Sequence, residues 1–226
     1  IIADLSSQEE IKRAASEFLS MNKPLNILLN NAGIMNTTRK ETVDGLEEVF
    51  SVNHLAYYSF TLMLMNKLIE NSPSRVVNVA SGAHMFVKDM NFDDLQSEKE
   101  YKTMQVYGRS KLANILFTRE LAEKLKGKGV TVNCLHPGFV NTGIGSNNSP
   151  TMGRILMTLA RPFSRKTDRG AETSIYLCVS PEVENETGEY FYDCKKEKIS
   201  AAASDKENAT KLWEVSSKLT GIDLLD

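Results

Sequence analysis

The sequence predicts an α/β protein built around a parallel sheet. Three short apolar or β-branched runs, at residues 25–29, 75–81 and 130–135, alternate with longer segments in which apolar residues recur at helical spacing. The connections between these runs are long enough for the helical crossovers that parallel strands require. We therefore expect an open sheet with helices on its faces.

Each expected element follows from periodicity and from the residues that start or end it. Ser6-Ser7-Gln8-Glu9 has the pattern of a helix N-cap, while Pro24 and Pro73 each precede an apolar run typical of a buried strand. The polar, irregular stretch at 82–103 is expected at the surface. In chain order we expect a strand at 1–5, a helix at 7–20, a strand at 25–29, a helix at 43–71, a strand at 75–81, a helix at 104–126, a strand at 130–135, a helix at 168–180, a strand at 189–192 and a helix at 205–219.

Composition excludes several classes of function. The chain has 226 residues and carries 27 Lys and Arg against 29 Asp and Glu, so its net charge is −2. This balance argues against a nucleic-acid partner. Three widely spaced cysteines fit a reducing compartment better than a disulfide framework, and no apolar run approaches the roughly 20 residues that span a bilayer. Without repeats or low-complexity tracts, residues 1–226 are expected to form one domain.

Polar residues follow the ends of the predicted strands, where ligands bind in open α/β sheets. They are Asn30 to Gly33, Ser81-Gly82 and His136-Pro137-Gly138. Tyr107 and Lys111 stand four residues apart in the helix at 104–126 and therefore share one face. An ammonium beside a phenol favours the phenolate, and a serine hydroxyl can orient a carbonyl or alcohol. This combination suits proton transfer, with hydride transfer left to a nicotinamide.

Four strings, in this order, resemble the signature set of the short-chain dehydrogenase/reductase family. They are NNAG at 30–33, VNVAS at 77–81, YGRSK at 107–111 and HPGFVNT at 136–142. Longer strings, such as SKLANILFTREL at 110–121, are similar to the retinol dehydrogenase-like branch, and the resemblance covers essentially the whole chain. It implies a Rossmann-type doubly wound parallel sheet. It also implies an oxidoreductase that transfers hydride between NAD(P) and the carbonyl or alcohol of a lipophilic substrate, such as a retinoid, a steroid or a fatty aldehyde.

The resemblance assigns roles to individual residues. The catalytic tetrad would be Asn53, Ser81, Tyr107 and Lys111. Tyr107 would give or take the proton, and Lys111 would lower its pKa and bind the cofactor ribose. Ser81 would hold the substrate oxygen, and Asn53 would anchor a relay water. Besides Tyr107 and Lys111, the cofactor would contact Asp4 and Leu5 at the adenine, Asn31, Ala32 and Gly33 at the adenosine ribose, and Pro137, Gly138, Val140 and Thr142 on the nicotinamide side.

The same resemblance covers the cofactor type and the partners. It favours NADP over NAD, and it places the apolar stretch Met152 to Phe163 over the substrate. No metal site is expected, because Cys134 and His136 lack a second ligand pair. Relatives are often tethered to membranes by an N-terminal segment, so the location within the cell stays open between cytoplasmic and membrane-associated. The family commonly forms homodimers through the helices expected at 43–71 and 104–126.

One departure from the family pattern concerns the dinucleotide loop. The family's glycine-rich string TGxxxGxG occurs nowhere in the chain, and by resemblance residue 1 falls in the third strand of a sheet with order 3-2-1-4-5-6-7. We therefore expect an N-terminally truncated domain without its first two strands. The segment at 1–5 would then have no neighbouring strand, and the strand at 25–29 would have an unpaired edge. Cofactor binding would be weakened by the loss of the pyrophosphate cradle.

Alternative interpretations of these residues stay open. Tyr107 and Lys111 could be a solvated helix pair, since Tyr192 and Lys196 repeat the spacing, and the stretch at 152–163 could be a core helix or a shallow membrane contact. A second class of function is a catalytically inactive fragment or pseudo-enzyme that acts, if at all, as an interaction module. A nucleotide-sugar epimerase also uses Tyr-x-x-x-Lys, but it needs a longer C-terminal substrate domain.

Overall fold

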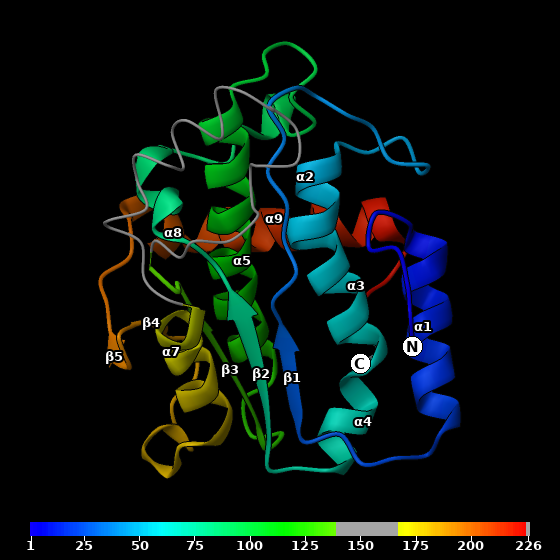
Figure 1. Cartoon of the computed structure of the whole chain (residues 1–226), viewed down its shortest axis with the longest axis vertical. Helices are drawn as coiled ribbons and strands as arrows, with labels where there is room; N and C mark the ends of the chain where they lie inside the picture. Colours follow the sequence, from blue (N-terminus) through cyan, green and yellow to red (C-terminus); the bar gives the residue numbers. More distant parts are fainter. Residues whose placement is uncertain (139–166, 225–226) are drawn as a thin grey trace.

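Four parallel strands form the centre of the protein. The computed structural model describes residues 1–138 and 167–224. In it β1, β2, β3 and β4 are neighbours in chain order, and a short β5 pairs antiparallel with β4 (Figure 1). Their bounds are Ile27–Asn30 for β1, Ser74–Val79 for β2, Val130–Leu135 for β3, Tyr190–Tyr192 for β4 and Lys195–Lys196 for β5. The predicted parallel α/β sheet is confirmed, whereas β5 was not predicted.

The register of the sheet brings the strand ends to one level. Asn30 of β1 pairs with Asn78 of β2, and Asn78 in turn pairs with Cys134 of β3. The residues that follow β1, β2 and β3 therefore emerge side by side at the carboxyl edge of the sheet. This is the edge at which open α/β sheets bind ligands.

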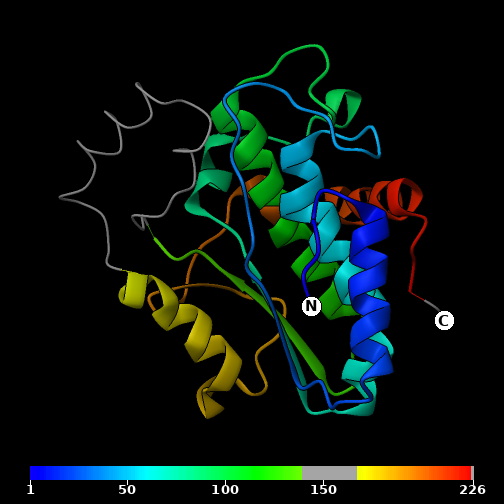
Figure 2. The ribbon, with the colours of Figure 1, turned by 45° about the vertical axis from the view of Figure 1, so that its right-hand side comes forward.

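Helices cover both faces of the sheet, but unequally. α7 (Thr167–Val179) lies on one face, where Leu177 packs against Val77 and Phe191, and the larger group of helices lies on the other (Figure 2). That group comprises α1 (Gln8–Ser20), α2 (Glu48–Phe50), α3 (Ala56–Met63), α4 (Met65–Glu70), α5 (Thr103–Lys124), α8 (Ala201–Ser204) and α9 (Lys206–Thr220). The main core lies between the sheet, α3, α4, α5 and α9.

The helix expected at 43–71 begins later and is interrupted. The buried carboxylate of Glu47 caps it by accepting hydrogen bonds from the amides of Val49 and Phe50, so the start at residue 43 is wrong. A π-helical turn, Ser51–Leu55, separates α2 from α3, and a break at Leu64 separates α3 from α4. π-turns of this kind frequently occur at functional sites, and this one contains Asn53.

The strand expected at residues 1–5 is wrong. Residues 1–4 have no regular structure and lie alongside α1, where Arg13 donates a hydrogen bond to the carbonyl of Ile2 (Figure 1). A strand needs a neighbouring strand for its backbone hydrogen bonds. Within the described part of the chain β1 pairs only with β2, and Ile27 and Leu29 are each 40% exposed. In the described part of the chain no strand pairs with residues 1–5.

α9 covers the helices on the main face of the sheet. Trp213 of α9 packs edge-on against Tyr58 of α3 and stacks with Phe117 of α5. A buried hydrogen bond of 2.9 Å joins His54 of the π-turn to Ser216 of α9. The homodimer expected through α3 and α5 would have to use surfaces that α9 leaves open, and it stays a prediction. None of the described helices is both long and apolar enough to cross a bilayer.

Candidate active site

The π-turn of the interrupted helix holds the loop that follows β1. The amide oxygen of Asn53 accepts a hydrogen bond from the Ile34 amide at 2.7 Å, and its nitrogen donates to the Ile34 carbonyl at 2.9 Å. The same nitrogen donates to the Ser110 hydroxyl on α5 at 2.9 Å. Asn53 therefore connects the loop to α5. Both polar atoms of its side chain form hydrogen bonds with other residues of the protein.

Lys111 projects from α5 into the space between β2 and the loop after β1. It is 3% exposed, and its ammonium donates a hydrogen bond to the Val79 carbonyl at 3.1 Å. Burial lowers its pKa to about 8, because the charged form has lost its water. A Cβ on Gly33 would lie 3.2 Å from the Lys111 ammonium and 3.2 Å from the Asn53 oxygen. A side chain at position 33 would therefore crowd both groups where the loop passes the lysine.

Tyr107 lies one turn before Lys111 and faces Ser81 at the end of β2. Burial raises the pKa of Tyr107, and a hydrogen bond with the Ser81 side chain opposes this rise. Lys111 lies 5.7 Å from the centre of the Tyr107 ring but does not lower this pKa in the structure. The expected role of Lys111 in acidifying the phenol is therefore not seen, because desolvation dominates both groups.

Tyr57 is a member of the site that sequence reasoning missed. It is buried on α3, one turn after Asn53, and its hydroxyl donates to the Ala32 carbonyl at 2.8 Å. Lys111 also lies over its ring, 5.8 Å from the centre. The available signal was the spacing of four residues between Asn53 and Tyr57, which places both on one helix face.

A buried chain of polar side chains fixes α5 to the sheet. Asn30 donates to Asn78 at 2.8 Å, Asn78 donates to Thr118 at 2.9 Å, and Thr118 donates to the Asn114 carbonyl at 2.7 Å. The Asn114 side chain then donates to the Val79 carbonyl at 3.2 Å, beside Lys111. Asparagines at the ends of apolar strands were the sequence signal for this chain, which sets the position of α5 relative to the strand ends.

The end of β3 supplies the other side of the site. Gly138 has a positive φ of 77°, and its amide donates to the His136 ring, which stacks on Tyr192 at 4.1 Å between centres. Pro137 lies between these two residues, so the expected turn after β3 is present. The predicted contacts of Val140, Thr142 and the stretch at 152–163 lie outside the described residues.

Asp4 and Leu5, two predicted cofactor residues, lie at the turn before α1. The Asp4 carboxylate accepts a hydrogen bond from the Ser6 amide at 2.8 Å, and the Asp4 carbonyl accepts one from the Ser7 amide. These contacts shape the turn that leads into α1. The expected placement of Asp4 and Leu5 at an adenine pocket depended on a strand at 1–5, which the structure does not form.

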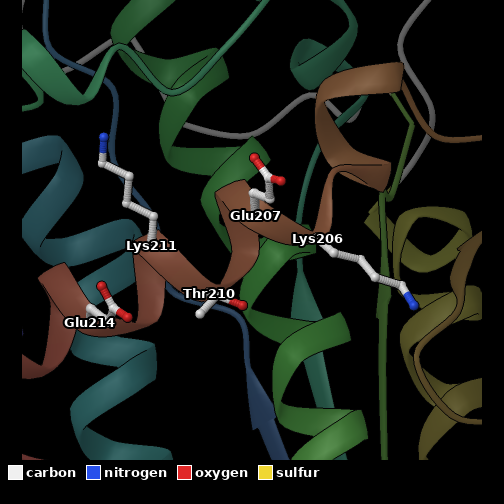
Figure 3. Close-up of a pocket in the computed structure, with 5 residues that line it drawn as sticks. All are labelled: Lys206, Glu207, Thr210, Lys211 and Glu214. Atoms are coloured by element: carbon white, nitrogen blue, oxygen red, sulfur yellow. The ribbon is translucent and has the colours of Figure 1, made fainter.

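Two other features could be taken for an active site, but neither includes the residues around Lys111. Lys196 of the second Tyr-x-x-x-Lys pair forms ion pairs with Glu186 and Glu189. A hollow on the outer face of α9 is lined by Lys206, Glu207, Thr210, Lys211 and Glu214, whose two lysines point in opposite directions (Figure 3). None of these five residues belongs to the group around Lys111, so neither feature competes with it as the candidate site.

The residues around Lys111 fit part of a dinucleotide. An ammonium has three N–H donors, and the Val79 carbonyl is its one hydrogen-bond acceptor within the described part of the chain. Two donors are thus left for ribose hydroxyls, next to a loop that Gly33 keeps free of side-chain atoms. The contacts around Lys111 therefore fit a ribose.

The sheet and the serine, tyrosine and lysine at its carboxyl edge define a Rossmann-type oxidoreductase. The short chain dehydrogenase family model matches residues 1–153, and a retinol dehydrogenase 12 from Mus musculus is 44% identical over 97% of this chain and 68% of its own. The chain therefore belongs to the short-chain dehydrogenase/reductase family, on its retinol dehydrogenase-like side. It spans about two thirds of the length of the curated relatives it matches.

Solved structures show the same fold. A crystal structure of an uncharacterised protein from Mycobacterium paratuberculosis superposes with a TM-score of 0.75 at 28% identity, covering 99% of this chain and 76% of its own. A short chain dehydrogenase/reductase family oxidoreductase from Brucella ovis, solved with a partially ordered NAD, gives a TM-score of 0.57 at 26% identity. That match covers 84% of this chain and 76% of its own.

Proposed function

We propose that the protein is an NAD(P)-dependent oxidoreductase that acts on the carbonyl or alcohol of a lipophilic molecule. The proposal rests on one observation. Ser81, Tyr107 and Lys111 lie close together at the carboxyl edge of the sheet, where β1, β2 and β3 end in register. The family places the protein among nicotinamide-dependent oxidoreductases. The geometry of the site suggests which of its side chains would transfer the proton and hold the substrate oxygen.

The side chains of the site suit the protonation half of a carbonyl reduction. The raised pKa of Tyr107 keeps its phenol protonated at neutral pH, so its hydroxyl can donate a proton to a carbonyl oxygen. Ser81, which is hydrogen-bonded to Tyr107, can hold the same oxygen. Lys111 supplies a nearby positive charge as negative charge develops on that oxygen. A nicotinamide cofactor, when bound, supplies or accepts the hydride.

Several residues are proposed to hold the cofactor. Lys111 and the loop at Asn31, Ala32 and Gly33 would contact the riboses, and Pro137 and Gly138 would lie along the nicotinamide. The structure from Brucella ovis supports a nicotinamide dinucleotide in this fold. NADP in preference to NAD rests on family resemblance alone, and so do the proposed roles of Val140 and Thr142.

A lipophilic substrate is supported by two kinds of evidence. The relatives at about 40% identity include retinol dehydrogenases 11, 12 and 14. Met85 and Phe86 follow Ser81 by four and five residues, Met104 precedes Tyr107 by three, and their side chains are 57%, 71% and 49% exposed. Apolar surface at the entrance to a site favours an apolar ligand over a sugar or an acid.

A direct test compares two tyrosines that share the Tyr-x-x-x-Lys spacing. With retinaldehyde or a long-chain aldehyde and NADPH or NADH, Tyr107→Phe should lower turnover by about 10² to 10⁴-fold, because the proton donor is lost. The matched Tyr192→Phe variant should retain turnover. Circular dichroism and thermal melting check that both variants fold. Equal turnover in Tyr107→Phe and the unaltered chain would remove the catalytic assignment.

A second candidate is the catalytically inactive interaction module. Titration of NADPH and NADH, followed by nucleotide fluorescence and thermal melting, separates the two. Micromolar binding with a cooperative melt supports the enzyme. A cooperative melt without binding supports the inactive module.

A further inference from the structure

Tyr57 joins the two parts of the site that have to be held together. Its hydroxyl reaches the Ala32 carbonyl at 2.8 Å, and its ring lies under the Lys111 ammonium at 5.8 Å. The Tyr57 side chain is 2% exposed. Although Tyr57 belongs to α3, it contacts both the loop after β1 and a side chain of α5.

We propose that Tyr57 is a positioning residue of the oxidoreductase site, fixing the Ala32–Ile34 backbone for the cofactor and holding the Lys111 ammonium in its charged form beside Tyr107. This inference rests on the proposed function, because it assigns Tyr57 a part in that same site. Neither the resemblance nor the sequence motifs point to this residue.

The first half of the proposal follows from how the loop is fastened. Asn53 binds both backbone polar groups of Ile34, and Tyr57 binds the carbonyl of Ala32, two residues earlier. Gly33 lies between these anchor points and has no side chain to pack. Loss of the Tyr57 hydroxyl would remove the hydrogen-bond donor to the Ala32 carbonyl and release one of the two anchors.

The second half follows from the surroundings of Lys111. Its ammonium lies over two aromatic rings, 5.8 Å from the centre of Tyr57 and 5.7 Å from the centre of Tyr107. Within the described residues these tyrosines are the titratable groups that face it, and its other contact is the neutral Val79 carbonyl. The electron-rich faces of the rings stabilise the cation at the point where burial has removed water. Tyr57 supplies one of these two faces.

Two substitutions separate these contributions. Tyr57→Phe keeps the ring and removes the hydroxyl, whereas Tyr57→Leu removes both. The Lys111 ammonium is followed by NMR of ¹³Cε-labelled lysine across pH 6–11, with Lys111→Met identifying the signal. Amide hydrogen exchange at Ile34 reports the loop, and steady-state kinetics give the cofactor KM and kcat.

Tyr57→Phe should accelerate Ile34 exchange by about fivefold and raise the cofactor KM with kcat unchanged. It should leave the pKa of Lys111 where it is in the unaltered chain. Tyr57→Leu should have the same effect on the loop and should also lower the pKa of Lys111 by about half a unit. A variant that merely loosened the fold would admit water and raise this pKa instead.

The outcomes distinguish this inference from the proposed function. Unchanged Ile34 exchange in Tyr57→Phe, or an unchanged or raised Lys111 pKa in Tyr57→Leu, overturns the positioning role. If both spectroscopic results appear as expected but the unaltered chain shows no turnover, the positioning role is supported and the proposed activity fails.

Discussion

Replacement of the buried lysine by methionine should make the protein more stable while it destroys the site. Burial lowers the pKa of Lys111 from 10.5 to about 8, which corresponds to a cost of about 3 kcal/mol for keeping its ammonium charged in the folded state. Lys111→Met keeps an unbranched side chain, shorter by one heavy atom, and removes the charge. The Val79 carbonyl keeps a donor, because Asn114 also binds it at 3.2 Å.

The sign of the pH dependence follows from proton counting. Between pH 8 and 10.5 the unfolded chain binds a proton at Lys111 that the folded chain has released, so stability rises with pH across this window. Below pH 8 both states are protonated and the full cost is present. The Lys111→Met variant should therefore be more stable by about 2 to 3 kcal/mol at pH 7, and this advantage should nearly vanish at pH 10.5.

Urea unfolding of both chains at pH 7, 9 and 10.5 measures this difference. Buried tyrosines and Cys134 also titrate at high pH, but they are common to both chains and cancel in the comparison. Lys12→Met, at an exposed position of α1, is the control and should change stability little at any of these pH values. A Lys111→Met chain that is less stable at pH 7, or whose advantage is the same at pH 10.5, would refute the reasoning.

Two further predictions concern packing. Gly108→Ala should lower the free energy of unfolding by about 1 to 3 kcal/mol, because the new Cβ would lie 2.8 Å from the Ala83 carbonyl. Gly82→Ala, whose Cβ would make only ordinary contacts, is the denaturation control. Trp213→Ala should cost about 3 to 5 kcal/mol by opening the core under α9. Glu214→Ala, on the exposed side of α9, should leave the midpoint of thermal melting within a few degrees, and equal shifts in the two variants would contradict the packing argument.

The sequence was informative where one residue type has a strong local consequence. β-branched runs ending in polar residues located β1, β2 and β3 to within about two residues, and the level ends of these strands followed from the parallel sheet. The spacing of Tyr107 and Lys111 correctly placed both on one face of α5. Local periodicity and turn chemistry are sufficient for such features, because they depend on neighbours in the chain.

The sequence was less informative where the outcome depends on distant partners. An apolar start at Ile1 and Ile2 has the composition of a strand, but a strand also needs a neighbouring strand, and none pairs with residues 1–5 in the described part of the chain. Burial also determines the direction in which the pKa values of Tyr107 and Lys111 shift. The spacing of Tyr107 and Lys111 predicted a lowered tyrosine pKa, whereas the desolvation seen in the fold raises it. Tyr57 was missed for the same reason, since its two partners lie in other elements.

The position of α9 has a consequence for synthesis of the chain on the ribosome. The contacts that seal the main core join residues far apart in sequence, such as Tyr58 with Ile222, whose carbonyl accepts the tyrosine hydroxyl at 3.1 Å. α3 and α5 emerge from the exit tunnel well before Trp213, and until then Tyr58 and Phe117 lack the packing of α9. A nascent chain is therefore exposed to chaperones and aggregation until its last helix has been released.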